Sequence, residues 1–291
     1  MKDRSVGGRI FDSVNILLLV LFAMATTLPF IHIVGTSFAS EHEVLTKDFI
    51  LFPTQFSLDA YRVIFANDRI MHSLFVTVFI TLAGTLINMI MTSLMAYPLS
   101  RKDLIGRKVL MMMVVFPMLF GGGMIPTYLL IKSLGLLNSF GSLMLPGAIN
   151  IFNLIVLKNF FQQMPDGLEE SAKIEGANDM VILIRLVLPL SLPALATFCL
   201  FYAVGHWNTF MAAVLYMNDA DKWPIQVLLR SIVLQSQNWL ESSEAMAETA
   251  SAQPQTVKMA VITVATMPIL CVYPFLQKHF AKGVMLGSVK G

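Results

Sequence analysis

Charged side chains are scarce in this sequence. Of its 291 residues, 13% are Asp, Glu, Lys or Arg, whereas 56% are hydrophobic, and the mean hydropathy is +0.71. A soluble domain devotes about a quarter of its residues to charge. This composition therefore argues against a soluble domain and for a protein embedded in lipid. The net charge of +2 is too small to indicate a nucleic-acid partner.

Motifs for catalysis and metal binding are also missing. The two cysteines, Cys199 and Cys271, both fall in apolar segments, where we read them as small apolar residues and not as a disulfide or metal site. The five histidines are scattered without metal-ligand spacing. The sequence has no G-x-x-x-x-G-K-[ST] phosphate-binding loop and no carboxylate pair in an apolar segment. We therefore expect a non-enzyme with no cofactor of its own.

Apolar segments of membrane-spanning length are abundant. A hydrocarbon core of about 30 Å needs roughly 20 apolar residues per helix. Six segments qualify, at about 13–38, 73–98, 108–131, 141–161, 189–217 and 257–280. The apolar run of the first is too long for a cleaved signal peptide, so we read it as a retained helix. The sequence predicts an all-α polytopic membrane protein, with residues 1–291 forming a single transmembrane domain.

The distribution of Lys and Arg predicts the orientation of these spans. Six spans place both termini on one side of the membrane, and that side carries 13 of the 20 basic residues. Because Lys and Arg accumulate on the cytoplasmic side, both termini and the loop after the fourth span should face the cytoplasm. The segments at about 39–72 and 218–256 should then face the other side.

Charged side chains in the predicted spans are confined to the span ends, with His206 as the one exception. Proton- and sodium-driven carriers usually keep an ionisable residue near the midplane. The energy source of this protein is therefore expected elsewhere. Two alternatives remain open: a self-contained secondary carrier or channel for a small polar solute, and an intramembrane enzyme. Each would need a site that the sequence does not display.

One short stretch, residues 165–176, is strongly charged and reads "PDGLEESAKIEG". Asp166 can cap a helix here, with Glu169 three residues later as in a capping box. Gly176 suits the C-terminal stop of the same helix. About nine helical residues rise only about 14 Å, which is too short to cross a membrane.

Helix breakers flank this stretch and recur elsewhere. Asn178 can start the next helix, and Pro189 and Pro193 predict a bend where that helix enters lipid. Residues 165–188 should therefore form a compact elbow at the cytoplasmic surface. The run "FGGGMIPTY" at 120–128 lacks the residues of a phosphate site, so it predicts a break or a close helix contact in the membrane.

This elbow resembles the E-A-A-x3-G-x9-I-x-L-P loop of ABC importer permeases. The matching residues are Glu170-Ser171-Ala172, Gly176 and Leu186-Val187-Leu188-Pro189, with Ser171 replacing Ala and Leu186 replacing Ile. The runs "LEESAKIEGA", "RLVLPLSLPALAT", "GLLNSFGSLMLPGAIN", "WNTF" and "YPFLQKHFAKGVMLGSVKG" extend the resemblance over most of the chain. They are similar to the MalG-type carbohydrate branch, and some look like its subgroup for complex or acidic oligosaccharides such as alginate.

The resemblance implies a fold, a location and partners. It implies the type I ABC importer permease fold, with six spans and a cytoplasmic coupling helix between the fourth and fifth, in a bacterial cytoplasmic membrane. ATP and magnesium would bind a partner ATPase, present as two subunits. A second homologous permease would complete a heterodimer around a carbohydrate path, and an extracytoplasmic solute-binding protein would deliver the sugar to the segment at 218–256. The alternative is that this segment is only a capping loop.

The resemblance also implies roles for residues of the elbow. Glu170 would be the main anchor to the ATPase and Glu169 the second, each accepting charge-assisted hydrogen bonds from it. Small side chains would let the helix seat deeply, and a glycine would permit the sharp exit. The tail with Lys282 and Lys290 would also reach the ATPase pair. The predicted coupling residues are Glu169, Glu170, Ser171, Ala172, Gly176 and Pro189.

Polar and aromatic side chains in the spans are candidates for lining the solute path. Sugars present hydroxyls to amides and C–H faces to aromatic rings. The alternative is structural, because Asn in a membrane helix often bonds a neighbouring helix and Trp often lies at the interface. The predicted path residues are Tyr202, Trp207, Asn208, Asn150, Asn153 and Asn88, with His206 beside them.

Overall fold

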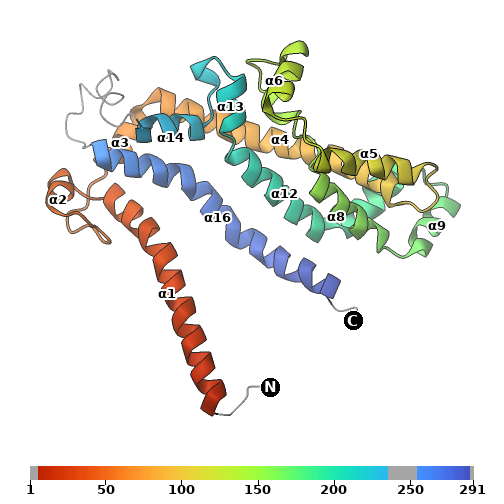
Figure 1. The fold of residues 1–291 in the computed structure, drawn as a ribbon, viewed down its shortest axis with the longest axis horizontal. Coiled ribbons are helices and arrows are strands. Elements are labelled where there is room, and N and C mark those ends of the chain that lie inside the picture. The colour runs from red at the N-terminus through yellow and green to blue at the C-terminus, as the bar shows by residue number, and fades with distance from the viewer. Residues whose placement is uncertain (1–5, 235–253, 289–291) are drawn as a thin grey trace. The chain divides into compact units, whose positions relative to one another are not determined.

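The computed structural model of this chain describes residues 6–234 and 254–288 (Figure 1). These residues form helices joined by turns, and the described ranges contain no strand beyond an isolated antiparallel bridge between Ala39 and Phe56. The prediction of an all-α protein is thus confirmed. The longer helices are α1 Val6–Ser37, α4 Asp68–Ser100, α5 Arg107–Leu119, α6 Met124–Ser133, α8 Ile151–Gln162, α12 Leu192–Trp207, α14 Ile225–Leu234 and α16 Pro254–Ser288. The shorter elements are α2 Glu41–Thr46, α3 Asp59–Ala66, α7 Gly141–Met144, α9 Asp166–Ile174, α10 Asp179–Ile182, a π-helix at Leu183–Val187, α11 Leu188–Leu190, α13 Met211–Tyr216 and a 3-10 turn at Ala220–Lys222.

Three helices of the described ranges are individually long and apolar enough to cross a membrane. They are α1, α4 and the Gln255–Val272 part of α16, which contain or overlap the predicted first, second and sixth spans. Two further spans result if bent helix pairs are counted, α5 with α6 and Asp179–Leu190 with α12. The total is then five, so the count of six spans stays a prediction.

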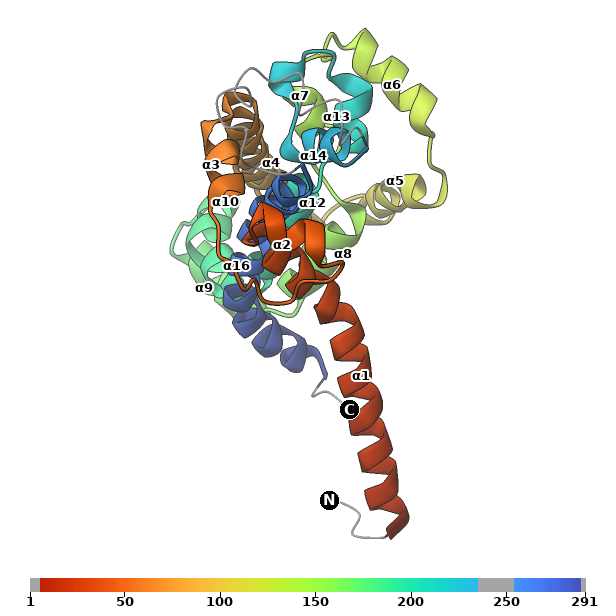
Figure 2. The ribbon, with the colours of Figure 1, turned by 90° about the vertical axis from the view of Figure 1, so that its left-hand side faces the viewer.

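Both predicted breaks are present. The Gly-rich run separates α5 from α6 by a bend of 117°, which is visible in Figure 2. Gly123 has a φ of +86° there, a conformation that side-chain-bearing residues rarely adopt. The second bend, of 86°, lies at Ser191 between Pro189 and Pro193, whose missing amide donors prevent a continuous helix.

The segment predicted as a fourth span, 141–161, is not one continuous helix. Here α7 ends at Met144 and α8 begins at Ile151. Pro146 and Gly147 fill the gap, and their missing donor and missing side chain disfavour a helix. The 12 residues of α8 rise only about 18 Å. The predicted fifth span, 189–217, is likewise interrupted after α12, before α13 begins.

The chain divides into two compact units. The first contains residues up to Met71 and the segment Leu229–Met267. In it, the loop after α2 folds back on the end of α1. The buried carboxylate of Glu43 accepts hydrogen bonds from the backbone N–H groups of Thr54 and Gln55 and from Lys47 Nζ. These bonds lower the pKa of Glu43 to about 2, and the bond from Lys47 has the largest effect.

The second unit contains His72–Leu228 and the segment from Pro268 onward. Its buried apolar side chains form two clusters. One joins the end of α4 to α8 and to the segment Ile182–Val187, with Leu157 and Val187 fully buried. The other joins the first half of α4 to α6, α7 and α13. The first cluster supports the elbow described below.

Some predicted features lie outside the described residues. These are residues 235–253 of the segment predicted to meet a solute-binding protein, and Lys290 of the predicted tail contact.

Candidate functional site

The predicted elbow is present as a short helix with defined ends. Helix α9 has nine residues, and Gly176 closes it with a φ of +85°. The N–H of Gly176 donates to the carbonyl of Lys173 at 3.0 Å, and the N–H of Ala177 donates to that of Ala172 at 3.0 Å, as in a Schellman motif. Asn178 then caps α10 by accepting from the N–H of Val181 at 2.9 Å. The stop at Gly176 and the start at Asn178 are both confirmed.

The predicted cap at the other end is wrong. The N-cap position is taken by Pro165, which makes no side-chain cap bond, and Asp166 is already the first helical residue. Pro165 explains this start, because a proline ring disfavours the helical conformation of the residue before it.

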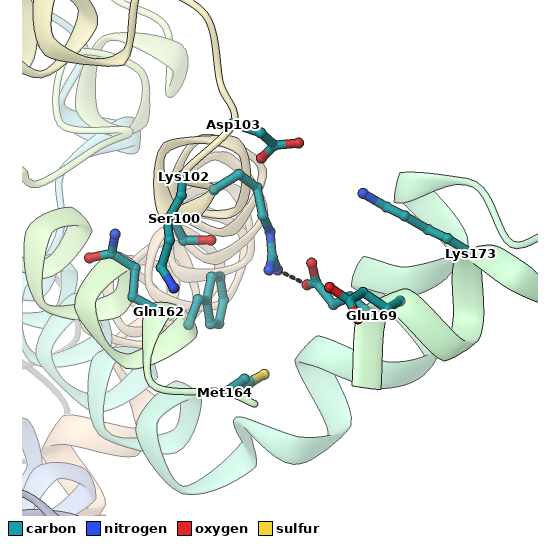
Figure 3. A pocket seen from close by; sticks show the side chains of 10 residues that line it. Ser100, Lys102, Asp103, Gln162, Met164, Glu169 and Lys173 are labelled. Carbon is teal, nitrogen blue, oxygen red and sulfur yellow. Dashed lines mark ion pairs between the residues drawn. The ribbon is translucent and has the colours of Figure 1, made fainter. Parts of the chain in front are cut away.

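Glu169 has an ion-pair partner within the chain. Its side chain is buried on the inner face of α9 and pairs with the guanidinium of Arg101, just after the end of α4 (Figure 3). The guanidinium also lies over the ring of Tyr97, 4.3 Å from its centroid. Burial raises the pKa of Glu169, and the positive charge of Arg101 opposes that rise. This clamp of three residues fixes α9 to the end of α4.

The outer face of α9 is open. Glu170 is exposed, and Ile174, one turn further on, is 87% exposed. Ser171 is exposed too, and its hydroxyl donates to the carbonyl of Gly167 at 2.9 Å. Ala172 instead packs against the apolar cluster of the second unit. The two adjacent glutamates therefore have different surroundings, one inside the molecule and one at its surface.

A cavity of about 230 Å³ separates α9 from the ends of α4 and α8. In Figure 3, Asp103 and Lys173 lie on opposite sides of its opening, and Met164 lies below. Lys173 pairs with Asp179 at 3.7 Å. Pro189, the last predicted coupling residue, lies in α11 just before the 86° bend and is exposed.

Two of the predicted path residues, Asn88 and Tyr202, take part with His206 in a polar network between helices. Asn88 Nδ2 donates to the carbonyl of Gly147 at 2.5 Å, which leaves its Oδ1 to accept from His206 Nε2, also at 2.5 Å. Tyr202 OH lies 2.7 Å from Thr92 Oγ1. These bonds join α4 to α12 and to the gap between α7 and α8.

Tyr202 also supports that gap directly. Its hydroxyl accepts from the backbone N–H of Asn150 at 3.1 Å. Asn150 Oδ1 in turn accepts from the N–H of Asn153 at 3.1 Å, which caps α8. Backbone groups freed from a helix at membrane depth need such partners, because lipid offers none. Among the predicted path residues, Asn88, Asn153, Tyr202 and Trp207 are buried, whereas Asn150 and Asn208 are exposed.

Sequence reasoning missed three participants, Arg101, Thr92 and Gly147. No local motif marks them. The same holds for Gly84, against which the ring of His206 packs so closely that a Cβ there would lie 2.5 Å from Nε2.

The fold and the site define a class of protein: a helical membrane component with a short polar helix held against the end of a spanning helix. The comparison with known families is more specific. The chain belongs to the family of binding-protein-dependent transport system inner membrane components, whose model matches residues 89–286. It is therefore a permease subunit of a transport system.

Individual relatives match this chain over nearly its full length. The chain is 60% identical to the polygalacturonan/rhamnogalacturonan transport system permease protein YtcP of Bacillus subtilis (strain 168), covering 98% of this chain and 99% of that one. It is 26% identical to the diacetylchitobiose uptake system permease protein NgcG of Streptomyces coelicolor, over 97% of this chain and 90% of that one. A solved bacterial ABC transporter involved in the import of the acidic polysaccharide alginate contains a chain 33% identical, with a TM-score of 0.89, covering 96% of this chain and all of the other.

Proposed function

We propose that this chain is one permease half of an ATP-driven importer for acidic oligosaccharides, in particular uronate-containing fragments of pectin-type polymers. The observation that carries this substrate class is the 60% identity, over nearly the full length of both chains, to a polygalacturonan/rhamnogalacturonan permease. The likeness to a chain of an alginate importer supports it, because alginate is also an acidic polysaccharide.

The energy comes from a partner. ATP and magnesium bind a separate ATPase, present as two subunits, and this chain performs no hydrolysis. The outer face of α9, with Glu170 and Ile174 exposed, docks on the ATPase. There Glu170 accepts charge-assisted hydrogen bonds and Ile174 is buried by the partner.

Movement of the ATPase reaches the membrane helices through the clamp. Because Glu169 pairs with Arg101 at the end of α4, a displacement of α9 pulls on a spanning helix as well as on the following bend at Ser191. The nucleotide state thereby biases a two-state equilibrium between inward-open and outward-open bundles. Glu169 thus holds the coupling helix on the permease and is not itself the second anchor to the ATPase.

The assembly is completed in a bacterial cytoplasmic membrane, with both termini and α9 on the cytoplasmic side. A second, homologous permease forms the other half of the path, and a solute-binding protein delivers the sugar from outside. The family description, which names a binding protein and an inner membrane component, supports this arrangement. Exposed Asn150 and Asn208 are the predicted path residues accessible to sugar hydroxyls, whereas buried Asn88 and Tyr202 hold helices together.

The test is uptake by the complete importer in proteoliposomes that carry binding protein outside and ATP inside. Wild-type vesicles should accumulate labelled trigalacturonate and not the neutral maltotriose. Glu170→Lys should lower uptake about tenfold or more, because it reverses a charge at the interface. ATPase activity of the complex should lose its dependence on loaded binding protein. Glu175→Lys, which reverses another exposed glutamate of the elbow, is the matched control and should transport normally.

Two results would contradict the proposal. Normal uptake by Glu170→Lys at normal membrane levels would remove the docking role of α9. Equal accumulation of trigalacturonate and maltotriose would remove the acidic substrate class and leave a general sugar permease.

A further inference from the structure

A second segment lies beside α9 on the same surface. Residues 101–106 connect α4 to α5 and form a tight turn. The N–H of Arg101 donates to the carbonyl of Pro98 at 3.1 Å, and Arg107 Nε donates to the carbonyl of Leu99 at 3.0 Å. Gly106, with a φ of +76°, is the N-cap residue before α5. The turn is therefore held to α4 at both of its ends.

Ile105 projects from this turn and is 94% exposed. Ile174 on α9, at 87%, follows it. They are the two most exposed large apolar side chains in the described part of the chain. Both lie between charged residues and outside the helices of spanning length, so acyl chains do not account for their exposure. A single exposed apolar side chain is common on protein surfaces, so the groove beside Ile105 is the observation that marks this place as a contact surface.

A groove of about 520 Å³ joins the turn to the elbow. Ile105 and Leu104 line one wall, and Lys173 and Met180 line the other. The ion pair between Arg101 and Glu169 joins the first residue of the turn to α9. The groove has an apolar floor that includes Leu183, and charges of both signs at its rim.

We propose that the ATPase subunit contacts the permease at two neighbouring places, α9 and the 101–106 turn, and that an apolar side chain of the ATPase enters the groove between them beside Ile105. This inference rests on the proposed function, because it takes α9 as the docking helix. The ATPase is the occupant because the groove adjoins the cavity that Glu170, the proposed docking residue, lines: Arg101, Asp103 and Lys173 line both. A second contact would resist rotation of α9 on the ATPase surface, and more of the ATPase movement would therefore be transmitted to α4.

Photo-crosslinking in the complete importer tests the contact directly. A benzophenone amino acid is placed at position 105, at 174, or at 45, where Leu45 is 67% exposed on α2 of the other unit. Positions 105 and 174 should both crosslink to the ATPase, with yields that change between the nucleotide-free and ATP-bound complex. Position 45 should give no ATPase adduct.

The three positions separate the two hypotheses. An ATPase adduct at 174 with none at 105 would overturn the second contact and leave the docking role of α9 intact. An adduct with lipid in place of the ATPase at 105 would do the same. Absence of adducts at both positions, with the complex intact, would contradict the proposed function itself.

A functional comparison completes the test. Ile105→Asp should lower the sugar transported per ATP hydrolysed about fivefold, since burying a charge in an apolar contact is unfavourable, whereas Ile105→Leu should stay within about twofold. Leu45→Asp is the control for an added surface charge. Equal transport ratios for Ile105→Asp and wild type would refute the contact.

Discussion

Removing the guanidinium of Arg101 is the most informative perturbation of the elbow. Arg101→Ala leaves the carboxylate of Glu169 on the inner face of α9 without its cation. Breaking a fully buried ion pair costs about 3–5 kcal/mol. Here the two side chains keep 19% and 11% of their exposure, so water screens part of the lost attraction. We therefore expect a cost of about 1–3 kcal/mol.

This cost should weaken the packing of α9 against the end of α4 and leave the rest of the fold intact. A loss of about 2 kcal/mol raises the population of molecules in which α9 is detached from α4 about 30-fold. Hydrogen exchange of the detergent-solubilised permease should accordingly be faster at the amides of 166–177, while the amides of α12 keep their rates. In proteoliposomes, the ratio of sugar moved to ATP hydrolysed should fall. Lys108→Ala removes a nearby exposed cation and should change neither readout.

The pH dependence of the variant identifies the cause. Burial already raises the pKa of Glu169 above its ordinary value of 4.5, and losing Arg101 should raise it further. A carboxyl whose pKa is raised when α9 is packed on α4 favours that packing at a pH below its ordinary pKa. The contribution is lost as the pH rises through the raised pKa. Acidification towards pH 4.5 should therefore slow exchange in α9 of Arg101→Ala more than in wild type.

Exchanging the two charges tests whether the ion pair between Arg101 and Glu169 holds α9 in place. Arg101→Glu combined with Glu169→Arg should recover much of the protection that either single change removes, because the pair is re-formed in reverse. If Arg101→Ala leaves exchange and coupling unchanged, or if the double variant is only the sum of the singles, the clamp does not hold α9 in place.

Two further predictions concern single sites. Gly84→Ala should destabilise the permease by about 1–3 kcal/mol in thermal unfolding, because its Cβ would overlap the ring of His206. Gly205→Ala is the control and should be neutral, since nothing lies within 4 Å of that position. Similar melting temperatures for both variants would show that His206 moves aside freely. Glu43→Gln should speed hydrogen exchange at the amide of Thr54, which donates to the Glu43 carboxylate. In wild type the same acceleration should appear as the pH falls from 4.5 towards 2, because the pKa of Glu43 is lowered to about 2 and its contribution disappears on protonation. Unchanged exchange across that range would contradict a structural role for the carboxylate.

The elbow was predictable because its signals are local. A glycine at the end of a helix and an asparagine before the next one act on backbone groups within a few residues, and both positions are confirmed. The breaks at 120–123 and at Ser191 follow equally from nearby glycine and proline. The break at Pro146 and Gly147 has the same kind of local signal, but it lies inside an apolar run of spanning length, and length alone predicts one continuous span there.

The partners of the polar residues were not predictable, because they come from distant parts of the chain. Asn88 and His206 are 118 positions apart, and nothing in either neighbourhood indicates the other. The chemistry of Asn and Tyr suits both a sugar and a backbone amide, so residue type alone could not decide between a path and a helix contact. Geometry separates them, because a side chain that already bonds a backbone carbonyl at 2.5 Å has little left to offer a solute.

The same reasoning links the interrupted span to the mechanism. A permease that changes shape needs places where its helices can bend, and the gap between α7 and α8 is one, with its backbone bonded to side chains of α4 and α12 and not to its own helix. The elbow is fixed to the far end of the same α4 through Arg101. One helix therefore carries both the attachment of α9 and the polar groups that hold the gap. We propose that a displacement imposed at α9 reaches that gap along α4, from Arg101 past Pro98 to Thr92 and Asn88.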